Sequence, residues 1–96
     1  MATVVVTPTA VEDLQRLIRT QSLPTTTTGR LRRSLEALRE FPLIGAPLHG
    51  RWAHYRFVLG PWRWMLVAYT YDQSTDRVAV VPIQDARSSS AATAAR

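Results

Sequence analysis

Cysteine and lysine are both absent from this chain of 96 residues, and it contains no long apolar run. Without cysteine, disulfides and thiolate chemistry are excluded, while the redox compartment stays open. No segment approaches the ~18 consecutive apolar residues that a membrane span needs. The N-terminus also lacks the basic and then apolar pattern of a signal peptide. We therefore expect a soluble cytoplasmic protein without a membrane partner.

Acidic residues are few, and arginine supplies the whole excess of positive charge. Twelve basic residues, all arginine, stand against seven acidic ones and give a net charge of +5. The guanidinium group is planar, permanently charged and well matched to phosphate. A small basic domain commonly binds nucleic acid or an acidic protein. A basic surface without a dedicated partner is the alternative.

The first half of the chain is predicted to contain one strand and two helices in a single domain. The run Val4-Val5-Val6 is β-branched and typical of a strand. Thr9 and Glu12 have the spacing of a capping box, which predicts a first helix over residues 10–20. A second helix is predicted over residues 29–41, with one apolar face made of Leu31, Leu35, Leu38 and Phe41.

The second half is predicted to be a sheet. Strands are expected over residues 51–59, 62–71 and 77–83, with turns at Gly60-Pro61 and at residues 72–76. The order β-α-α-β-β-β predicts an α+β fold in which two N-terminal helices pack on one face of a small, mainly antiparallel sheet. We expect residues 1–87 to form the domain and residues 88–96, which lack an apolar anchor, to form a flexible tail.

The turn at Gly60-Pro61 predicts which side chains share a face of the sheet. An even loop brings Leu59 opposite Trp62 and Val58 opposite Arg63. The face expected under the helices then carries Tyr55, Phe57, Leu59, Trp62, Trp64 and Leu66. The open face would bring Arg56 and Arg63 together, and these like charges repel unless an anion lies between them. Two solvated arginines are the alternative, and an odd loop would separate the pair.

Several motifs, taken in order, resemble one known family. They are Pro42 with Leu48-His49-Gly50 before the sheet, the hairpin Tyr55-Arg56 to Gly60-Pro61-Trp62-Arg63, and Arg87 after the last strand. Together they make residues 3–88 similar to the RelE/ParE toxin superfamily of type II toxin–antitoxin systems, more to RelE than to ParE. The fold that this resemblance implies is the one expected from the residue pattern.

The resemblance implies one of three activities. RelE-like members are metal-independent and cofactor-free endoribonucleases that enter the ribosome and cleave mRNA by attack of a 2′-hydroxyl on the adjacent phosphate. ParE-like members inhibit DNA gyrase without cleaving RNA. A degenerate member would retain only the binding of its antitoxin. In each case the partner is an acidic antitoxin protein, and operator DNA is bound only in complex with that antitoxin.

The resemblance also implies a set of site residues. Arg56, Arg63 and Arg87 occupy basic positions that would stabilise the phosphate or its transition state, and Arg51 joins them as an RNA-binding residue. The acid–base residue that RelE-like enzymes carry near the C-terminus is missing, because no tyrosine or histidine follows Tyr71. By strand alternation His54 shares a face with Arg56 and is the candidate substitute, ahead of His49. No metal-ligand motif occurs.

Overall fold

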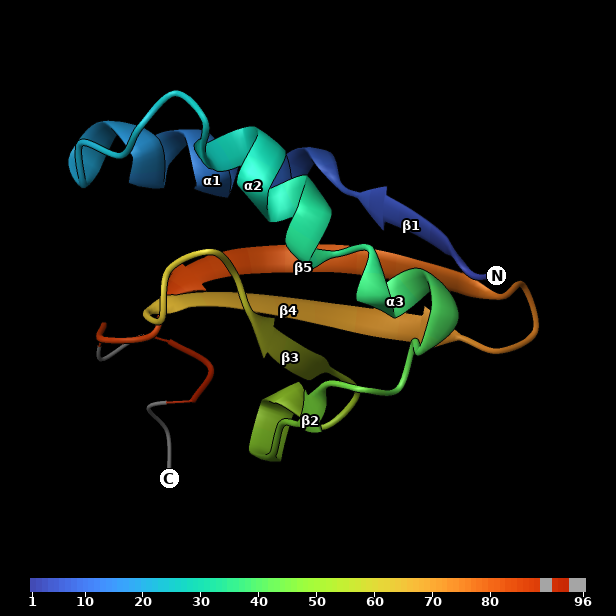
Figure 1. Cartoon of the computed structure of the whole chain (residues 1–96). Helices are drawn as coiled ribbons and strands as arrows, with labels where there is room; N and C mark the ends of the chain where they lie inside the picture. Colours follow the sequence, from blue (N-terminus) through green and yellow to red (C-terminus); the bar gives the residue numbers. More distant parts are fainter. Residues whose placement is uncertain (89–90, 94–96) are drawn as a thin grey trace.

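The chain forms a sheet with helices on one side, as seen in a computed structural model that describes residues 1–88 and 91–93 (Figure 1). The elements in chain order are β1 (Thr3–Val6), α1 (Pro8–Thr20), α2 (Thr27–Ser34), α3 (Ala37–Glu40), β2 (Ala46–Pro47), a 3₁₀ turn (Gly50–Trp52), β3 (Arg56–Leu59), β4 (Met65–Asp72) and β5 (Arg77–Asp85). The α+β class predicted from the sequence is confirmed.

The sheet has five strands in the order β1-β5-β4-β3-β2. β1 runs parallel to β5, and the other neighbours are antiparallel. β2 was not predicted, because its two residues belong to a segment rich in glycine and proline. Ala46 and Pro47 nevertheless pair with β3. Proline is tolerated there because β2 lies at the sheet edge, where its missing N–H leaves no ladder bond unmade.

Helix α1 begins two residues earlier than the sequence pattern predicts. Thr7, not Thr9, caps it: the Ala10 amide donates to Thr7 Oγ1 at 3.3 Å. The Thr7 hydroxyl itself donates to the Val80 carbonyl at 2.9 Å and fastens the cap to β5. Pro8 fits the first helical position, which needs no amide donor and suits the fixed φ of proline. Thr9 and Glu12 therefore lie inside the helix, and the predicted capping box is wrong.

The predicted second helix is divided into α2 and α3. Between them the Glu36, Leu38 and Arg39 amides donate to carbonyls three residues back, which is a tight 3₁₀ turn. Leu31, Leu35 and Leu38 are buried as predicted. Phe41, the fourth residue of the predicted apolar face, is 58% exposed. The tight turn shifts the helical period, and the backbone leaves the helix at Phe41.

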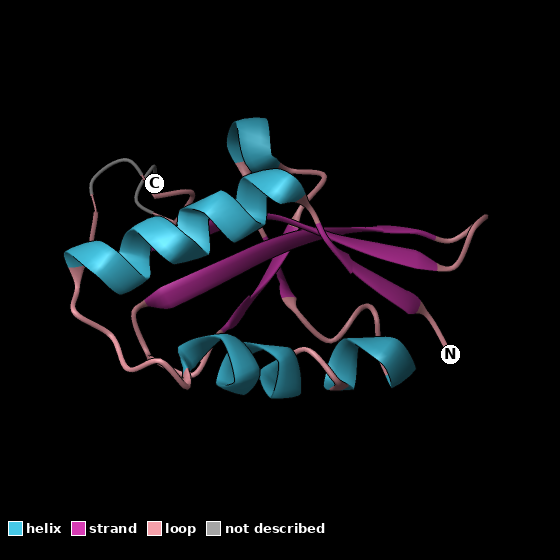
Figure 2. Cartoon of the chain, turned by 90° about the horizontal axis from the view of Figure 1, so that it is seen from above, coloured by secondary structure: helices cyan, strands magenta, loops and turns pink. Residues whose placement is uncertain are grey.

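Both faces of the sheet carry an apolar cluster. On the helix side, residues of the three helices pack against Val58, Met65, Val67, Tyr69, Val78 and Val80 (Figure 2). The other face is covered by a second cluster of Leu48, Trp52, Tyr55, Phe57, Leu66, Ala68, Ala86 and Ala92. The predicted alternation along β3 and β4 is correct, but Tyr55, Phe57 and Leu66 lie on the face away from the helices, where the prediction was wrong. Trp62 and Trp64 pack on the helix side as predicted. Pattern alone could not decide this, since the first five residues of β4 are all buried.

Residues 91 and 92 pack back against the sheet beyond β5. Ala91 and Ala92 are buried, and the Ala92 amide donates to Gln84 Oε1 at 2.8 Å. Their burial was not predicted, because two alanines in a polar segment give no strong apolar signal in the sequence. Other parts of the predicted tail, residues 89–90 and 94–96, lie outside the described residues.

Candidate nucleic-acid interface

The loop that joins β3 to β4 carries an arginine between two tryptophans. The register brings Leu59 opposite Leu66, so Trp62, Arg63 and Trp64 lie in the loop and not in the strands. The Gly60 amide donates to the Met65 carbonyl at 2.8 Å, and the Met65 amide to the Trp62 carbonyl at 2.9 Å. These bonds close the loop and leave the Arg63 side chain exposed.

Each tryptophan of the loop is covered by an arginine from another element. The guanidinium of Arg30, on α2, lies 4.6 Å from the ring centroid of Trp62. The guanidinium of Arg87, just after β5, lies 4.6 Å from that of Trp64. A cation over an indole face is attracted by the ring quadrupole, and more strongly when it is partly shielded from water. The two stacks hold the loop from both sides, with Arg63 between them in the chain.

Arg87 is already bound to a carboxylate. Its Nε and Nη2 donate to Asp85 Oδ1 and Oδ2, each at 2.9 Å, and Nη2 lies 3.4 Å from Gln21 Oε1. The hydrogen bonds from Arg87 lower the pKa of the Asp85 carboxyl, and the same pair raises the pKa of Arg87. An incoming phosphate at Arg87 therefore competes with a resident anion.

Arg56 lies away from this loop, and its guanidinium donates hydrogen bonds to backbone carbonyls. Its Nη1 donates to the carbonyls of Gly45 at 2.8 Å and Leu43 at 3.2 Å. Arg56 pairs across the sheet with Tyr69. It precedes Leu59, the last residue before the loop, by three positions, which is about 10 Å along the strand at ~3.4 Å per residue. The predicted juxtaposition of Arg56 and Arg63 is wrong because the loop is longer than a two-residue turn.

Beside Arg56, the Tyr69 hydroxyl accepts a hydrogen bond from the Gly45 amide at 2.9 Å. Burial raises the pKa of Tyr69, while the Gly45 hydrogen bond and the charge of Arg56 offset part of the rise. A Cβ on Gly45 would lie 2.6 Å from the Tyr69 hydroxyl and 2.7 Å from the Phe57 carbonyl oxygen. Only glycine fits here, so Arg56, Gly45 and Tyr69 together hold the segment before β2.

Arg51 and His54 belong to the segment between β2 and β3. Arg51 lies in the 3₁₀ turn, 6.0 Å from the Trp52 ring centroid, and His54 follows that turn. Strand alternation does not extend to His54, so the predicted sharing of a face with Arg56 lacks its basis. Both side chains are exposed, as is His49. Among residues 1–88 and 91–93, none of the three side chains forms a hydrogen bond or ion pair, although the His49 carbonyl accepts a hydrogen bond from the Trp52 amide at 3.2 Å.

Charges of both signs lie at each end of the sheet, since Asp85 accompanies Arg87 at one end and Arg77 begins β5 next to Asp76 at the other. Arg63 and Arg87 lie at the end where β4 begins and β5 finishes. Glu40 ends α3, and Asp72 and Asp76 flank the β4–β5 turn at the other end (Figure 1). Arg30 was not predicted as a site residue, because no sequence pattern links α2 to a tryptophan thirty-two positions later.

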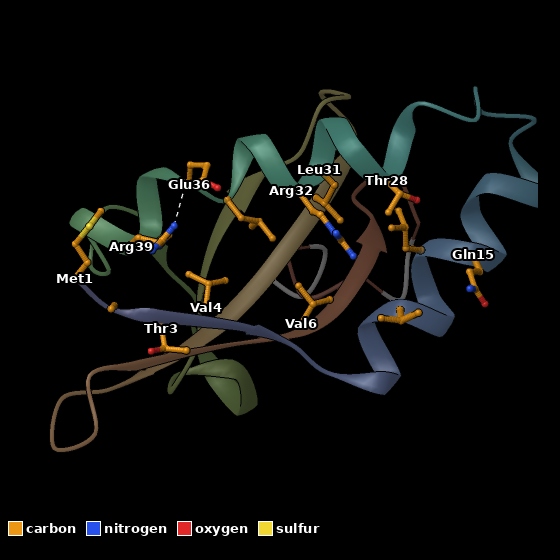
Figure 3. Close-up of a pocket in the computed structure, with 14 residues that line it drawn as sticks. Met1, Thr3, Val4, Val6, Gln15, Thr28, Leu31, Arg32, Glu36 and Arg39 are labelled. Carbon is orange, nitrogen blue, oxygen red and sulfur yellow. Dashed lines mark ion pairs between the residues drawn. The ribbon is translucent and has the colours of Figure 1, made fainter.

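A groove of about 800 Å³ separates β1 and α1 from α2. Its lining is mixed: Val4, Val6, Val11, Leu14, Leu31 and Leu35 form the aliphatic part, and Thr3, Gln15, Thr28, Arg32, Glu36 and Arg39 form the polar part. Arg32 extends from α2 toward Val6, while Arg39 pairs with Glu36 at 3.5 Å near the end of the groove (Figure 3). The groove therefore combines aliphatic and polar walls, and Arg32, Glu36 and Arg39 are its charged side chains.

Residues 1–88 and 91–93 contain no group of three histidine, aspartate or glutamate side chains arranged to hold a metal ion. No helix among these residues is long and apolar enough to cross a membrane.

Comparison with solved structures shows that this fold also occurs in a chain of a toxin–antitoxin complex, as the sequence resemblance predicts. A chain of the toxin–antitoxin complex RelBE2 from Mycobacterium tuberculosis has a TM-score of 0.66 at 22% identity, over 88% of this chain and 96% of that one. The conserved hypothetical proteins HP0892 and HP0894 from Helicobacter pylori give 0.61 at 14% and 0.55 at 15% identity. The match covers 88% of this chain and 94% of HP0892, and 86% of this chain and 92% of HP0894. Neither a family model nor a curated protein matches the sequence.

Proposed function

We propose that this chain is the toxin of a type II toxin–antitoxin pair and that it cleaves mRNA on the ribosome without a metal ion. The observation that carries the toxin role is the fold, which nearly the whole chain shares with a chain of the RelBE2 complex. The observation that favours RNA as the target is the basic loop end of the sheet, where Arg63 is exposed between two tryptophans.

In the proposed reaction the 2′-hydroxyl of the RNA attacks the adjacent phosphorus. The O2′–P bond forms, the P–O5′ bond breaks, and negative charge grows on the phosphoryl oxygens. Fixed cations beside that charge lower the barrier. We assign this role to Arg63, and to Arg87 once its guanidinium is shared between the phosphate and Asp85. Arg56 supports the site indirectly through the Gly45 and Leu43 carbonyls.

The proton of the 2′-hydroxyl needs an acceptor, and the 5′-oxygen needs a donor. His54 is our candidate for one of these steps, because imidazole changes its protonation near neutral pH. Its side chain is exposed, so a substrate bound on the ribosome can reach it. Arg51, three positions before His54, is then available to the RNA backbone in the same exposed segment.

The groove between β1, α1 and α2 suits the expected antitoxin. An acidic amphipathic helix would bury its apolar side against the aliphatic walls and pair its carboxylates with Arg32. We propose that this antitoxin, acting in the cytoplasm, blocks the toxin and brings it to operator DNA in the complex.

The second candidate is a ParE-like inhibitor of DNA gyrase. Two features favour it: Arg56 is held by backbone carbonyls and Arg87 by Asp85, and no tyrosine or histidine follows Tyr71. A chain that only binds its target needs no acid–base residue. A degenerate toxin that binds only its antitoxin is the third possibility.

Inducible expression in a bacterial host separates these functions. For a nuclease we expect growth arrest and new mRNA 5′ ends by primer extension, with both lost in Arg63→Ala. Arg77→Ala, which removes an equal charge at the β4–β5 turn, is the matched control and should stay toxic. Arrest with intact mRNA and inhibited gyrase supercoiling would instead support the ParE-like function. No arrest by the wild-type chain would contradict both.

A further inference from the structure

The two arginine–tryptophan stacks differ in one respect. Both guanidinium groups lie 4.6 Å from an indole centroid. Arg87 is neutralised by two hydrogen bonds from its guanidinium to Asp85. Arg30 has no ion pair with any carboxylate of residues 1–88 and 91–93. The stack on α2 therefore carries a positive charge that no acid of the described chain balances.

The Arg30 guanidinium is well prepared to accept an anion. Stacking uses the flat face of the group and leaves its N–H edge for hydrogen bonds. The side chain is half-buried against Trp62, so it loses little rotational freedom when an anion binds. The Trp62 Nε1 donor is buried without a partner in the described residues, a cost that phenylalanine would avoid. The indole at this position thus contributes more than packing.

Two further arginines extend the surface. Arg33 follows Arg30 by three residues on α2 and lies on the same helix face. Arg63 directly follows Trp62 and is exposed. Neither forms an ion pair with a carboxylate of the described chain. Three arginines without a carboxylate partner in the described chain therefore lie on α2 and in the loop at Trp62, whereas the arginine beside Trp64 is neutralised.

We infer that Arg30, Arg33 and Arg63 form a binding surface for the phosphates of single-stranded RNA, and that the first phosphate to bind lies at Arg30 and Arg63 rather than at Arg87. This inference rests on the proposed action on RNA and adds helix α2 to the surface. The strand would cross from the β3–β4 loop onto α2, on the side of the helix away from Arg32 and the groove.

The test is binding of a fluorescein-labelled oligouridine of twelve nucleotides, followed by anisotropy across a range of salt concentrations. Each phosphate contact on a single strand contributes about 0.7 to the slope of log K against log salt. We expect Arg33→Ala and Arg63→Ala each to bind several-fold more weakly and to lower that slope by about 0.7. Arg30→Lys should keep the wild-type slope, and Arg30→Ala should lower it by about 0.7 as well. Arg77→Ala is the control of equal charge.

The outcomes separate this inference from the proposed function. If Arg63→Ala weakens binding while Arg30→Ala and Arg33→Ala match the control, the α2 surface is wrong and RNA binding stands. If the wild-type chain does not bind the oligonucleotide at low salt, the inference is overturned, while the ribosome-dependent nuclease function is decided separately by the appearance of new mRNA 5′ ends. Arg33 does not contact Trp62, so Arg33→Ala tests the surface even if Arg30→Ala disturbs the loop; circular dichroism checks each variant. Equal losses in all variants, Arg77→Ala included, would mean bulk charge alone and overturn the inference.

Discussion

Tyr69 is one of two sheet residues whose side chains hold the segment before β2, the other being Arg56. It is fully buried, and its hydroxyl accepts the Gly45 amide hydrogen bond. The same segment accepts hydrogen bonds from Arg56 through two carbonyls. A phenol on β4 and an arginine on β3 thus fix a segment that has no helix and only two strand residues of its own.

Replacing Tyr69 by phenylalanine leaves the buried Gly45 amide without an acceptor. We expect Tyr69→Phe to lower the free energy of unfolding by about 1–3 kcal/mol, the usual cost of an unsatisfied buried donor. Urea unfolding measures it. Tyr71→Phe is the matched control, because Tyr71 donates to Asp76 Oδ1 at an exposed position. Equal losses in the two variants would contradict the assignment.

Asp85 makes stability depend on acid pH. Its pKa is lowered in the folded chain, chiefly by the hydrogen bond from Arg87, so the folded state binds a proton less readily than the unfolded state. The stabilisation is complete above the ordinary aspartate pKa of about 3.9 and is lost as the pH falls through that value toward the lower folded one. We expect Asp85→Asn and Arg87→Ala to flatten thermal stability between about pH 5 and 3. An unchanged pH profile in both variants would argue against the pair.

Among the elements, α1 shows how a tertiary contact selects a helix start. Threonines at positions 7 and 9 are both acceptable caps by residue type, and Thr9 also has Glu12 three residues on. The cap is Thr7 because Pro8 takes the first helical position and the Thr7 hydroxyl reaches the Val80 carbonyl. Pairing of β1 with β5 ends at Val6 and brings Thr7 to that carbonyl.

The two threonines give a direct comparison. Thr7→Ala removes the cap and should lower the free energy of unfolding by about 0.5–2 kcal/mol. Thr9→Ala should change it little or raise it slightly, since alanine favours the helix interior more than threonine does. Chemical denaturation of both variants measures the difference. A larger loss in Thr9→Ala would restore the capping box that the sequence pattern suggests.

The break between α2 and α3 is a second place where the structure of an element differs from the sequence prediction. Leu31, Leu35 and Leu38 follow helical spacing closely enough that one continuous helix is the natural expectation. The chain keeps all three residues buried while tightening to a 3₁₀ turn, which moves Phe41 outward. Apolar periodicity predicts which residues are buried more reliably than it predicts where a helix bends.

At the scale of the whole molecule, local sequence determines most of the element list. β-branched runs, apolar periods of a helix, and glycine or proline breaks act between residues close in the chain. They are sufficient to predict β1, α1 and the strands β4 and β5, and their order leads to the α+β class. The strand β2 could not be predicted, because two residues are too few to show a periodic pattern. Only its pairing with β3 in the structure identifies it as a strand.

The candidate site depends on contacts between distant residues. Arg63 and Arg87 were predicted from the sequence by resemblance alone. The structure brings the β3–β4 loop, which carries Arg63, next to the end of β5, which precedes Arg87. The contact is a hydrogen bond from the Ala86 amide to the Trp64 carbonyl at 2.7 Å. Arg56 was chosen on the same basis but binds backbone carbonyls, because the loop shifts the hairpin register by four residues relative to a two-residue turn.

The low number of acidic residues and the excess of arginine are properties of the sequence alone. They determine that the protein is basic and suited to phosphate or to an acidic partner. Only the tertiary structure decides where that charge is usable, since neutralisation depends on which side chains meet in space. Asp85 neutralises Arg87 from two residues away, whereas Arg30 meets Trp62 across thirty-two positions and meets no acid of the described chain. Neither contact follows from charge or period along the chain.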